Sequence, residues 1–211
     1  MRCAMLVAMS LSLWACRSPP AAGTGPTQTL GPGSPDALRS VEAFASIPEP
    51  AARSAALFSE ATKVFLHPRC VNCHPNGDSP LQDAGHVHDP PVARGKDDRG
   101  VPGLLCTSCH QDKNLELARV PGAPNWHLAP RSMAWQGKSP RELCEQLLDP
   151  ARNGGRTHEQ LIEHVSHDAL VAWGWSPGHE RAAAPGTQEQ FGKLVAAWLQ
   201  TGAACPEGAV R

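Results

Sequence analysis

The 211-residue sequence has no tyrosine, only four phenylalanines and a formal net charge of −1. So few large aromatic side chains, combined with 21 prolines, leave little material for a protein-only hydrophobic core, and small domains of this kind usually need covalent or cofactor support. The absence of a basic tract leaves no electrostatic footprint for nucleic-acid binding. We therefore expect a small domain that is stabilised by more than its own apolar side chains.

The N-terminus has the pattern of an export signal. Arg2 provides a positive start, and residues 4–15 form an apolar stretch that is too short to span a bilayer as a mature helix. The stretch ends Leu13-Trp14-Ala15-Cys16, which resembles the lipobox of bacterial lipoproteins. Residues 1–16 are therefore predicted to be a signal peptide, with Cys16 as the lipidated residue and plain secretory cleavage as the alternative. Either route places the mature protein in the periplasm, with a lipid on Cys16 adding attachment to the membrane.

Residues 17–48 are predicted to be a flexible tether, and its part up to Asp36 is rich in proline, glycine, serine and threonine. Such a composition cannot bury enough apolar surface to order itself. Residues 49–211 suit a single domain.

Two copies of the motif C-x-x-C-H are the strongest functional signal in the chain. This spacing is the attachment site of a c-type haem, in which two thiols bond to the porphyrin and the following histidine binds the iron. Two copies 36 positions apart in an exported chain predict two covalently bound c-type haems. The attachment cysteines are Cys70, Cys73, Cys106 and Cys109, and the proximal iron ligands are His74 and His110.

Other uses of paired cysteines fit less well. Zinc ribbons usually separate their C-x-x-C pairs by about 15–20 residues, whereas 32 residues lie between Cys73 and Cys106. A thioredoxin-like motif requires a strand–helix context, which these proline- and glycine-rich surroundings lack. A structural disulfide within each pair remains the simplest alternative.

The distal iron ligands must be chosen among eight other histidines and a methionine. His88 lies on a proline-stiffened loop between the motifs, and His127 lies in the apolar segment Pro-Asn-Trp-His-Leu-Ala-Pro. We predict bis-histidine coordination with these two as the leading candidates. Met133 and His164 are the reserves, and a methionine ligand would raise the reduction potential relative to histidine.

Two further cysteines, Cys144 and Cys205, remain after the signal, lipid and haem positions are assigned. In an oxidising compartment a disulfide between them is expected, with two buried free thiols as the alternative.

Helical signals flank the haem motifs. Residues 51–66 carry apolar side chains among alanines, Ser139 with Glu142 forms a capping box that opens a helix through residue 148, and Thr157 and Thr187 open two more. Between residues 75 and 131 no run has the periodicity of a strand or helix. The predicted fold class is a mainly α, cytochrome c-like domain, with short helices and long loops around two haems.

Short segments spread over residues 70–206 also match a known family. They are CVNCHP at 70–75, CTSCHQ at 106–111, PGAP at 121–124, WHLAP at 126–130, MAW at 133–135, DP at 149–150, RNG at 152–154, LVAWGWSPG at 170–178 and GAACP at 202–206. Together they resemble exported proteobacterial c-type cytochromes known as isoquinoline 1-oxidoreductase subunits. The resemblance implies a partner: a molybdenum hydroxylase that oxidises a heterocycle or an aldehyde. The present chain has no molybdopterin or iron–sulfur signature of its own.

The leading functional prediction is therefore an electron carrier. It would accept electrons from a dehydrogenase or molybdenum hydroxylase and pass them to a cytochrome or an oxidase. A di-haem enzyme of the peroxidase type, with one open iron position, and a haem-based sensor are the alternatives.

Overall fold

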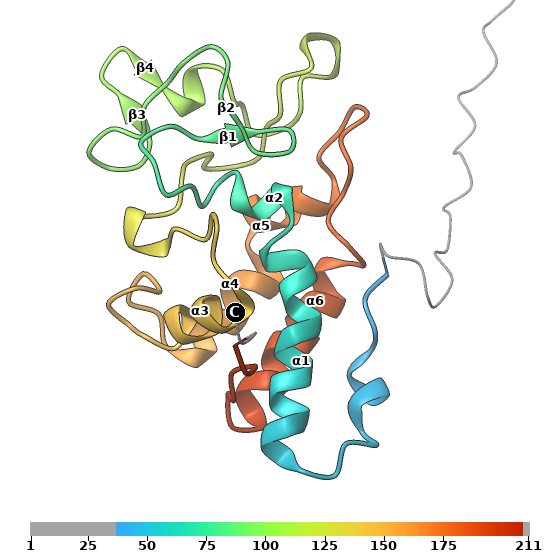
Figure 1. Ribbon diagram of the computed structural model, residues 1–211. Helices are drawn as coiled ribbons and strands as arrows, with labels where there is room; N and C mark the ends of the chain where they lie inside the picture. The colour runs from blue at the N-terminus through green and yellow to red at the C-terminus, as the bar shows by residue number, and fades with distance from the viewer. Residues whose placement is uncertain (1–36, 209–211) are drawn as a thin grey trace, which may run out of the picture.

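The computed structural model describes residues 37–208, in which helices fill one end of the molecule and long loops with two small β-hairpins form the other (Figure 1). The predicted mainly helical class with long loops is confirmed. The α-helices are α1 (Pro50–Phe65), α2 (Pro68–Val71), α3 (Pro140–Leu147), α4 (His158–His167), α5 (Ala169–Ala172) and α6 (Gln188–Gln200). Short 3-10 helices are η1 (Val41–Phe44), η2 (Cys106–Ser108), η3 (Glu116–Ala118), η4 (Arg131–Met133) and η5 (Trp173–Trp175).

The four longest helices begin where their caps are found in the sequence. Ser139, Thr157 and Thr187 each accept a hydrogen bond from the third residue of the helix that follows, and that residue's side chain binds back to the cap. These capping boxes satisfy amides that would otherwise lack a partner at the start of a helix. At the start of α1 the carboxylate of Glu49 accepts from the backbone amides of Ala51 and Ala52. The predicted helices are therefore confirmed to within one or two residues.

The core lies where α6 packs against α1 and α4. Its aromatic side chains form a connected row, with ring centroids 4.5 Å apart for Phe58 and Trp198 and 5.8 Å apart for Phe58 and Phe65. Phe65 in turn contacts Trp135 edge-on at 5.3 Å. Trp135 comes from the loop end of the molecule, so the row extends the helical core toward the first C-x-x-C-H motif.

Two β-hairpins stand in the region where no strand was expected. The first pairs β1 (Leu81–Gln82) with β2 (His86–Val87), and the second pairs β3 (Gly100–Val101) with β4 (Leu104–Leu105), both antiparallel. Pro102 and Gly103 connect β3 to β4, and Gly103 has φ +84°, as the second central position of a type II turn requires. Strands of two residues are too short to produce an alternating sequence pattern, which explains why the prediction missed them.

The folded domain starts earlier than predicted. Within residues 37–48, which were assigned to the tether, Leu38 and Phe44 are buried, and the backbone amide of Arg39 donates to Glu60 Oε1 at 3.0 Å. The boundary expected at residue 49 is therefore wrong, because these two apolar side chains anchor the segment to the helices. The predicted signal peptide, the lipidation site Cys16 and tether residues 17–36 lie outside the described residues.

A disulfide joins Cys144 in α3 to Cys205, which follows α6. These are the two cysteines that remained after the signal, lipid and haem positions were assigned. The bond holds the C-terminal segment against α3. None of the helices within residues 37–208 is long and apolar enough to cross a membrane.

Candidate functional site

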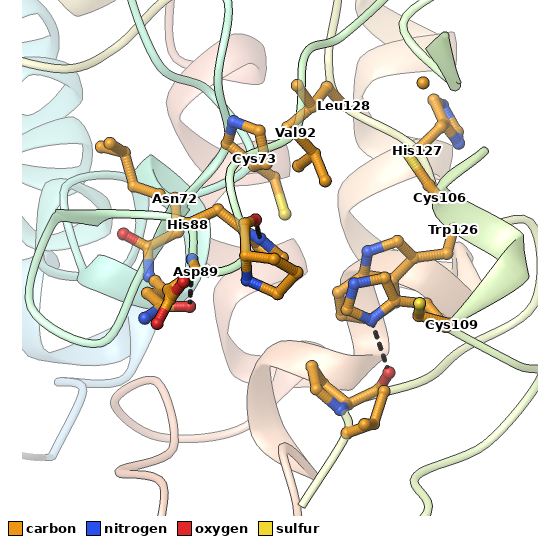
Figure 2. A pocket seen from close by; sticks show the side chains of 18 of the residues that line it. Asn72, Cys73, His88, Asp89, Val92, Cys106, Cys109, Trp126, His127 and Leu128 are labelled. Atoms are coloured by element: carbon orange, nitrogen blue, oxygen red, sulfur yellow. Dashed lines mark hydrogen bonds between the residues drawn. The ribbon is translucent and has the colours of Figure 1, made fainter. Parts of the chain in front are cut away.

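The two C-x-x-C-H motifs meet at one cavity in the loop end of the molecule. The first motif starts in α2 and the second coincides with η2, directly after β4. Cys73 from the first motif lines a cavity of about 410 Å³ together with Cys106, Cys109 and His110 from the second (Figure 2). Segments far apart in the sequence therefore line the same cavity.

Both motif histidines are held in the same way. Nδ1 of His74 lies 2.8 Å from the carbonyl oxygen of Met133, and Nδ1 of His110 lies 2.7 Å from that of Pro121. A carbonyl oxygen only accepts, so each Nδ1 carries the proton and each Nε2 keeps its lone pair. This arrangement fixes both the tautomer and the ring orientation of a histidine that binds a metal through Nε2.

A tryptophan stacks on each of these imidazoles. The rings of His74 and Trp135 have centroids 3.3 Å apart and planes within 7°, and those of His110 and Trp126 have centroids 4.6 Å apart and planes within 9°. Burial is the main reason that the pKa of His74 falls to about 3, and it also lowers the pKa of His110. Both histidines are consequently neutral near pH 7, the protonation state in which imidazole binds metals.

One loop segment, residues 121–135, supplies all four of these contacts. It provides the two carbonyls, of Pro121 and Met133, and the two tryptophans. Its backbone also pairs with the first motif, because the amide of Ala129 donates to the Cys73 carbonyl at 3.0 Å and that of Trp135 to the His74 carbonyl at 2.9 Å. The segment was expected to supply distal ligands, but the contacts shown are with the Nδ1 side and the ring faces of the motif histidines.

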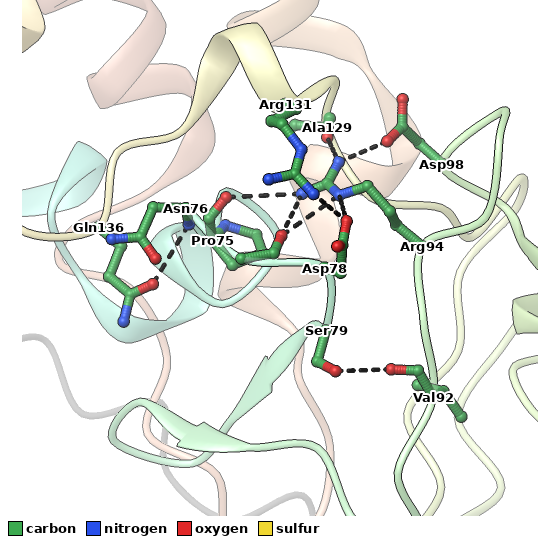
Figure 3. A network of polar contacts seen from close by, with 11 residues as sticks. Pro75, Asn76, Asp78, Ser79, Val92, Arg94, Asp98, Ala129, Arg131 and Gln136 are labelled. Carbon is green, nitrogen blue, oxygen red and sulfur yellow. Dashed lines mark hydrogen bonds and ion pairs between the residues drawn. The ribbon is translucent and has the colours of Figure 1, made fainter.

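Arg94 fastens this segment to the loop that follows the first motif (Figure 3). Its buried guanidinium donates to the carbonyls of Ala129 and Gly77, at 2.8 and 3.1 Å, and pairs with the carboxylate of Asp98. Sequence reasoning missed Arg94, since an arginine in an aperiodic stretch looks like a solvated side chain. The neighbouring Val-Ala-Arg-Gly sequence carries no signal of its burial.

The motif cysteines differ in depth. Cys70, Cys73 and Cys106 are half-buried, whereas Cys109 is exposed. Burial raises the pKa of the Cys70 thiol to about 12 and that of Cys73 to about 11, and it also raises the pKa of Cys106. The first pair therefore lies in a less polar setting, and all four cysteines are free of disulfides.

The ring of His88, a predicted distal ligand, lies close to the ring of the motif histidine His110. Its ring centroid is 5.9 Å from that of His110, with the planes at 70°. Two imidazoles that bind one metal at about 2 Å each have ring centroids roughly 6 Å apart. Nδ1 of His88 also lies 2.8 Å from a carbonyl, that of Pro90, which leaves its Nε2 available.

The other candidates lie elsewhere around the site. His127 lines the same cavity and directs Nδ1 toward the carbonyl of Asn125 at 2.5 Å. His164, in α4, has Nδ1 3.2 Å from an Asp168 carboxylate oxygen, and it is close enough to His74 to contribute to the lowered pKa of that residue. The Met133 thioether is buried in the core, 3.5 Å from Nη1 of Arg156.

No protein-family description, curated protein or solved structure matches this chain.

Proposed function

We propose that this chain is an exported di-haem c-type cytochrome that carries electrons and does not itself transform a substrate. The observation that carries the proposal is the duplicated support of the motif histidines. In each motif Nδ1 faces a backbone carbonyl and a tryptophan covers the ring. Zinc held by cysteines alone, or a structural disulfide within each pair, would give no reason for this treatment of both histidines.

The residues fit the group that the motifs imply. Cys70 with Cys73, and Cys106 with Cys109, would hold the two porphyrins covalently, and His74 and His110 would bind the irons through Nε2. When bound, each haem would supply a one-electron ferric/ferrous couple. Apolar side chains on the cavity wall would exclude water from the second porphyrin; they include Val92, Leu104, Leu105 and Leu128.

For the distal ligand at the second iron we propose His88, on the 5.9 Å spacing to His110. For the first iron we favour His164 over His127, because His164 is the histidine whose charge acts on His74. Met133 fits a supporting role better than a ligand role, since its carbonyl is already held by Nδ1 of His74. Two histidines at each iron would leave no open position for peroxide, as expected of a carrier and not of an enzyme.

The shared cavity supports electron exchange between the two sites. Cys73 and Cys106, one from each motif, line the same cavity, so the two porphyrins attached there would lie close together. An electron could then enter at one site and leave at the other. We propose a periplasmic location with a lipid on Cys16 as the membrane anchor, a dehydrogenase or molybdenum hydroxylase as the donor, and a cytochrome or oxidase as the acceptor.

Intact-mass measurement of the purified protein tests the central claim. We expect a mass that exceeds the mature chain by two haems, and one haem fewer after Cys106→Ala with Cys109→Ala. A chain that carries zinc or no adduct would overturn the proposal.

The spin state of the ferric protein then tests the carrier assignment. We expect two low-spin signals in the electron paramagnetic resonance spectrum. His88→Ala should convert one of them to high spin, whereas His86→Ala, an exposed histidine on the same hairpin, should leave both unchanged. A high-spin component in the wild-type protein, together with rapid peroxide turnover, would favour the enzyme instead.

A further inference from the structure

Three arginines stand on the wall between the motif cavity and a neighbouring open groove. Arg69 from α2, Arg119 after η3 and Arg181 from the loop before α6 line both the 410 Å³ cavity and the groove, whose volume is about 540 Å³. The guanidinium of Arg181 donates to the carbonyls of Pro177, at 3.1 Å, and of Arg119. The side of the cavity that they form is therefore positively charged.

Arg69 is the most constrained of the three. It is half-buried beside the ring of Trp173, with the guanidinium carbon 5.9 Å from the ring centroid, and it donates through Nη2 to the Asp83 carbonyl at 3.1 Å. Its Nε is buried without a hydrogen-bond partner. A buried donor in this state costs free energy unless a bound group satisfies it.

These arginines have no close carboxylate partner, although the charge of Asp83 acts on Arg69. Among residues 37–208, none of the three forms an ion pair with a carboxylate. Asp83 lines both the cavity and the groove, Asp89 lines the cavity and Glu180 lines the groove. Burial, followed by the charge of Arg181, lowers the pKa of Arg69. Two adjacent like charges in a poorly solvated wall indicate a site for an anion.

We propose that Arg69 and Arg181 bind the carboxylates of the second porphyrin, the one attached through Cys106 and Cys109. This inference rests on the proposed function, and it adds a role for the two arginines as positioning residues that also set the reduction potential. A guanidinium held near the iron opposes the extra positive charge of the ferric state. It therefore favours the ferrous state and raises the potential of that haem. Arg181 lines the same cavity as His110 and its charge acts on that residue, so it would also act on an iron bound by His110.

The test is a spectroelectrochemical titration of both haems in the isolated, fully loaded protein. Arg69→Gln and Arg181→Gln should each lower the potential of the same haem, and Arg181→Lys should restore most of the loss. Arg141→Gln is the matched control, because Arg141 is an α3 residue paired with Glu145 at 2.8 Å and does not line the cavity. It should leave both potentials unchanged.

A second readout identifies the carboxylates directly. The infrared difference spectrum between oxidised and reduced protein should show carboxylate bands that shift in Arg69→Gln and Arg181→Gln but not in Arg141→Gln. If Arg69→Gln does not fold, Arg181→Gln, in a half-buried loop residue, provides the measurement alone.

The competing source of carboxylates is an acidic surface on a redox partner. In that case the variants would weaken partner binding while the potentials and infrared bands of the isolated protein stayed at wild-type values, and the inference would be overturned. The proposed function would survive that result, because it fails on a different observation: a mass without two haem adducts.

Discussion

The indole of Trp135 lies flat on the imidazole of His74, with the ring centroids 3.3 Å apart. The same indole meets Phe65 edge-on at 5.3 Å, and only 6% of Trp135 is exposed. The Trp135 side chain thus packs both against the helical core and against the histidine of the first motif. The position of His74 is consequently coupled to the packing of α1.

We expect Trp135→Ala to lower the free energy of unfolding by about 3–5 kcal/mol, the usual cost of truncating a buried aromatic residue. Trp126→Ala, at the corresponding half-buried position on His110, should cost clearly less. Trp135→Phe should also cost less, because Nε1 of Trp135 is buried without a partner and the phenyl ring removes that donor. Denaturant titrations of the three variants measure these differences, and equal losses for Trp135→Ala and Trp126→Ala would contradict the ranking.

Arg94 and Arg131 provide a matched pair in one network (Figure 3). Arg94 is 6% exposed and pairs with Asp98, whereas Arg131 is 55% exposed and pairs with Asp78. Removing one partner of a buried ion pair costs about 3–5 kcal/mol, while an exposed pair contributes about 1 kcal/mol or less. Arg94→Ala should therefore destabilise the protein severely and Arg131→Ala only slightly. Thermal or denaturant unfolding decides between this and a similar effect at both positions.

The disulfide between Cys144 and Cys205 closes a loop with a sequence separation of 61 residues. Replacing both cysteines by alanine should lower the free energy of unfolding by about 2–4 kcal/mol, mainly because the unfolded chain gains freedom. If both haems are attached, the sulfurs of the four motif cysteines are already bonded to the porphyrins, so a reductant acts on the Cys144–Cys205 disulfide alone. Reduced wild-type protein should then unfold at the same denaturant concentration as the double variant, and an unchanged midpoint after reduction would count against the prediction.

The cap of α1 predicts a pH dependence of stability. The backbone amides of Ala52 and Ala51 hold the pKa of Glu49 below its usual value. A carboxylate with a depressed pKa stabilises the folded state above the unfolded pKa of about 4.5, and this contribution is lost as the pH falls through the folded pKa. Glu49→Gln should therefore show a smaller loss of stability on acidification below about pH 5 than the wild type. Glu207→Gln, at an exposed C-terminal position, should behave like the wild type.

The sequence located the helices because their starts depend on local chemistry. The capping partners of Ser139 and Thr187 lie three residues further along the chain. The residues that indicate the start of each helix are therefore the same ones that form its cap. The start of the domain was misplaced because Leu38 and Phe44 are isolated apolar residues in the sequence. Only the folded structure shows that this segment packs against α1 and α6.

The site was predictable in its cysteines and histidines but not in its supports. The motif spacing is a local pattern, whereas the carbonyls of Met133 and Pro121 reach His74 and His110 across 59 and 11 residues. Every residue has a backbone carbonyl, so residue identity does not show which carbonyls will accept these hydrogen bonds. Arg94 was missed for a related reason, since four of its hydrogen bonds go to three backbone carbonyl oxygens in other loops, those of Pro75, Gly77 and Ala129.

The free state of Cys70, Cys73, Cys106 and Cys109 beside the closed Cys144–Cys205 bond gives this chain two opposing requirements during maturation. Under the proposed function, one pair must be oxidised, while the other two must remain reduced until their sulfurs react with a porphyrin. A premature disulfide within either motif would block haem attachment. Thiol–disulfide exchange between a motif cysteine and Cys205 would break the disulfide that holds the C-terminal segment on α3. In the proposed periplasmic setting, the yield of finished protein would therefore depend on the balance between thiol oxidation and thiol reduction in the cell that produces it.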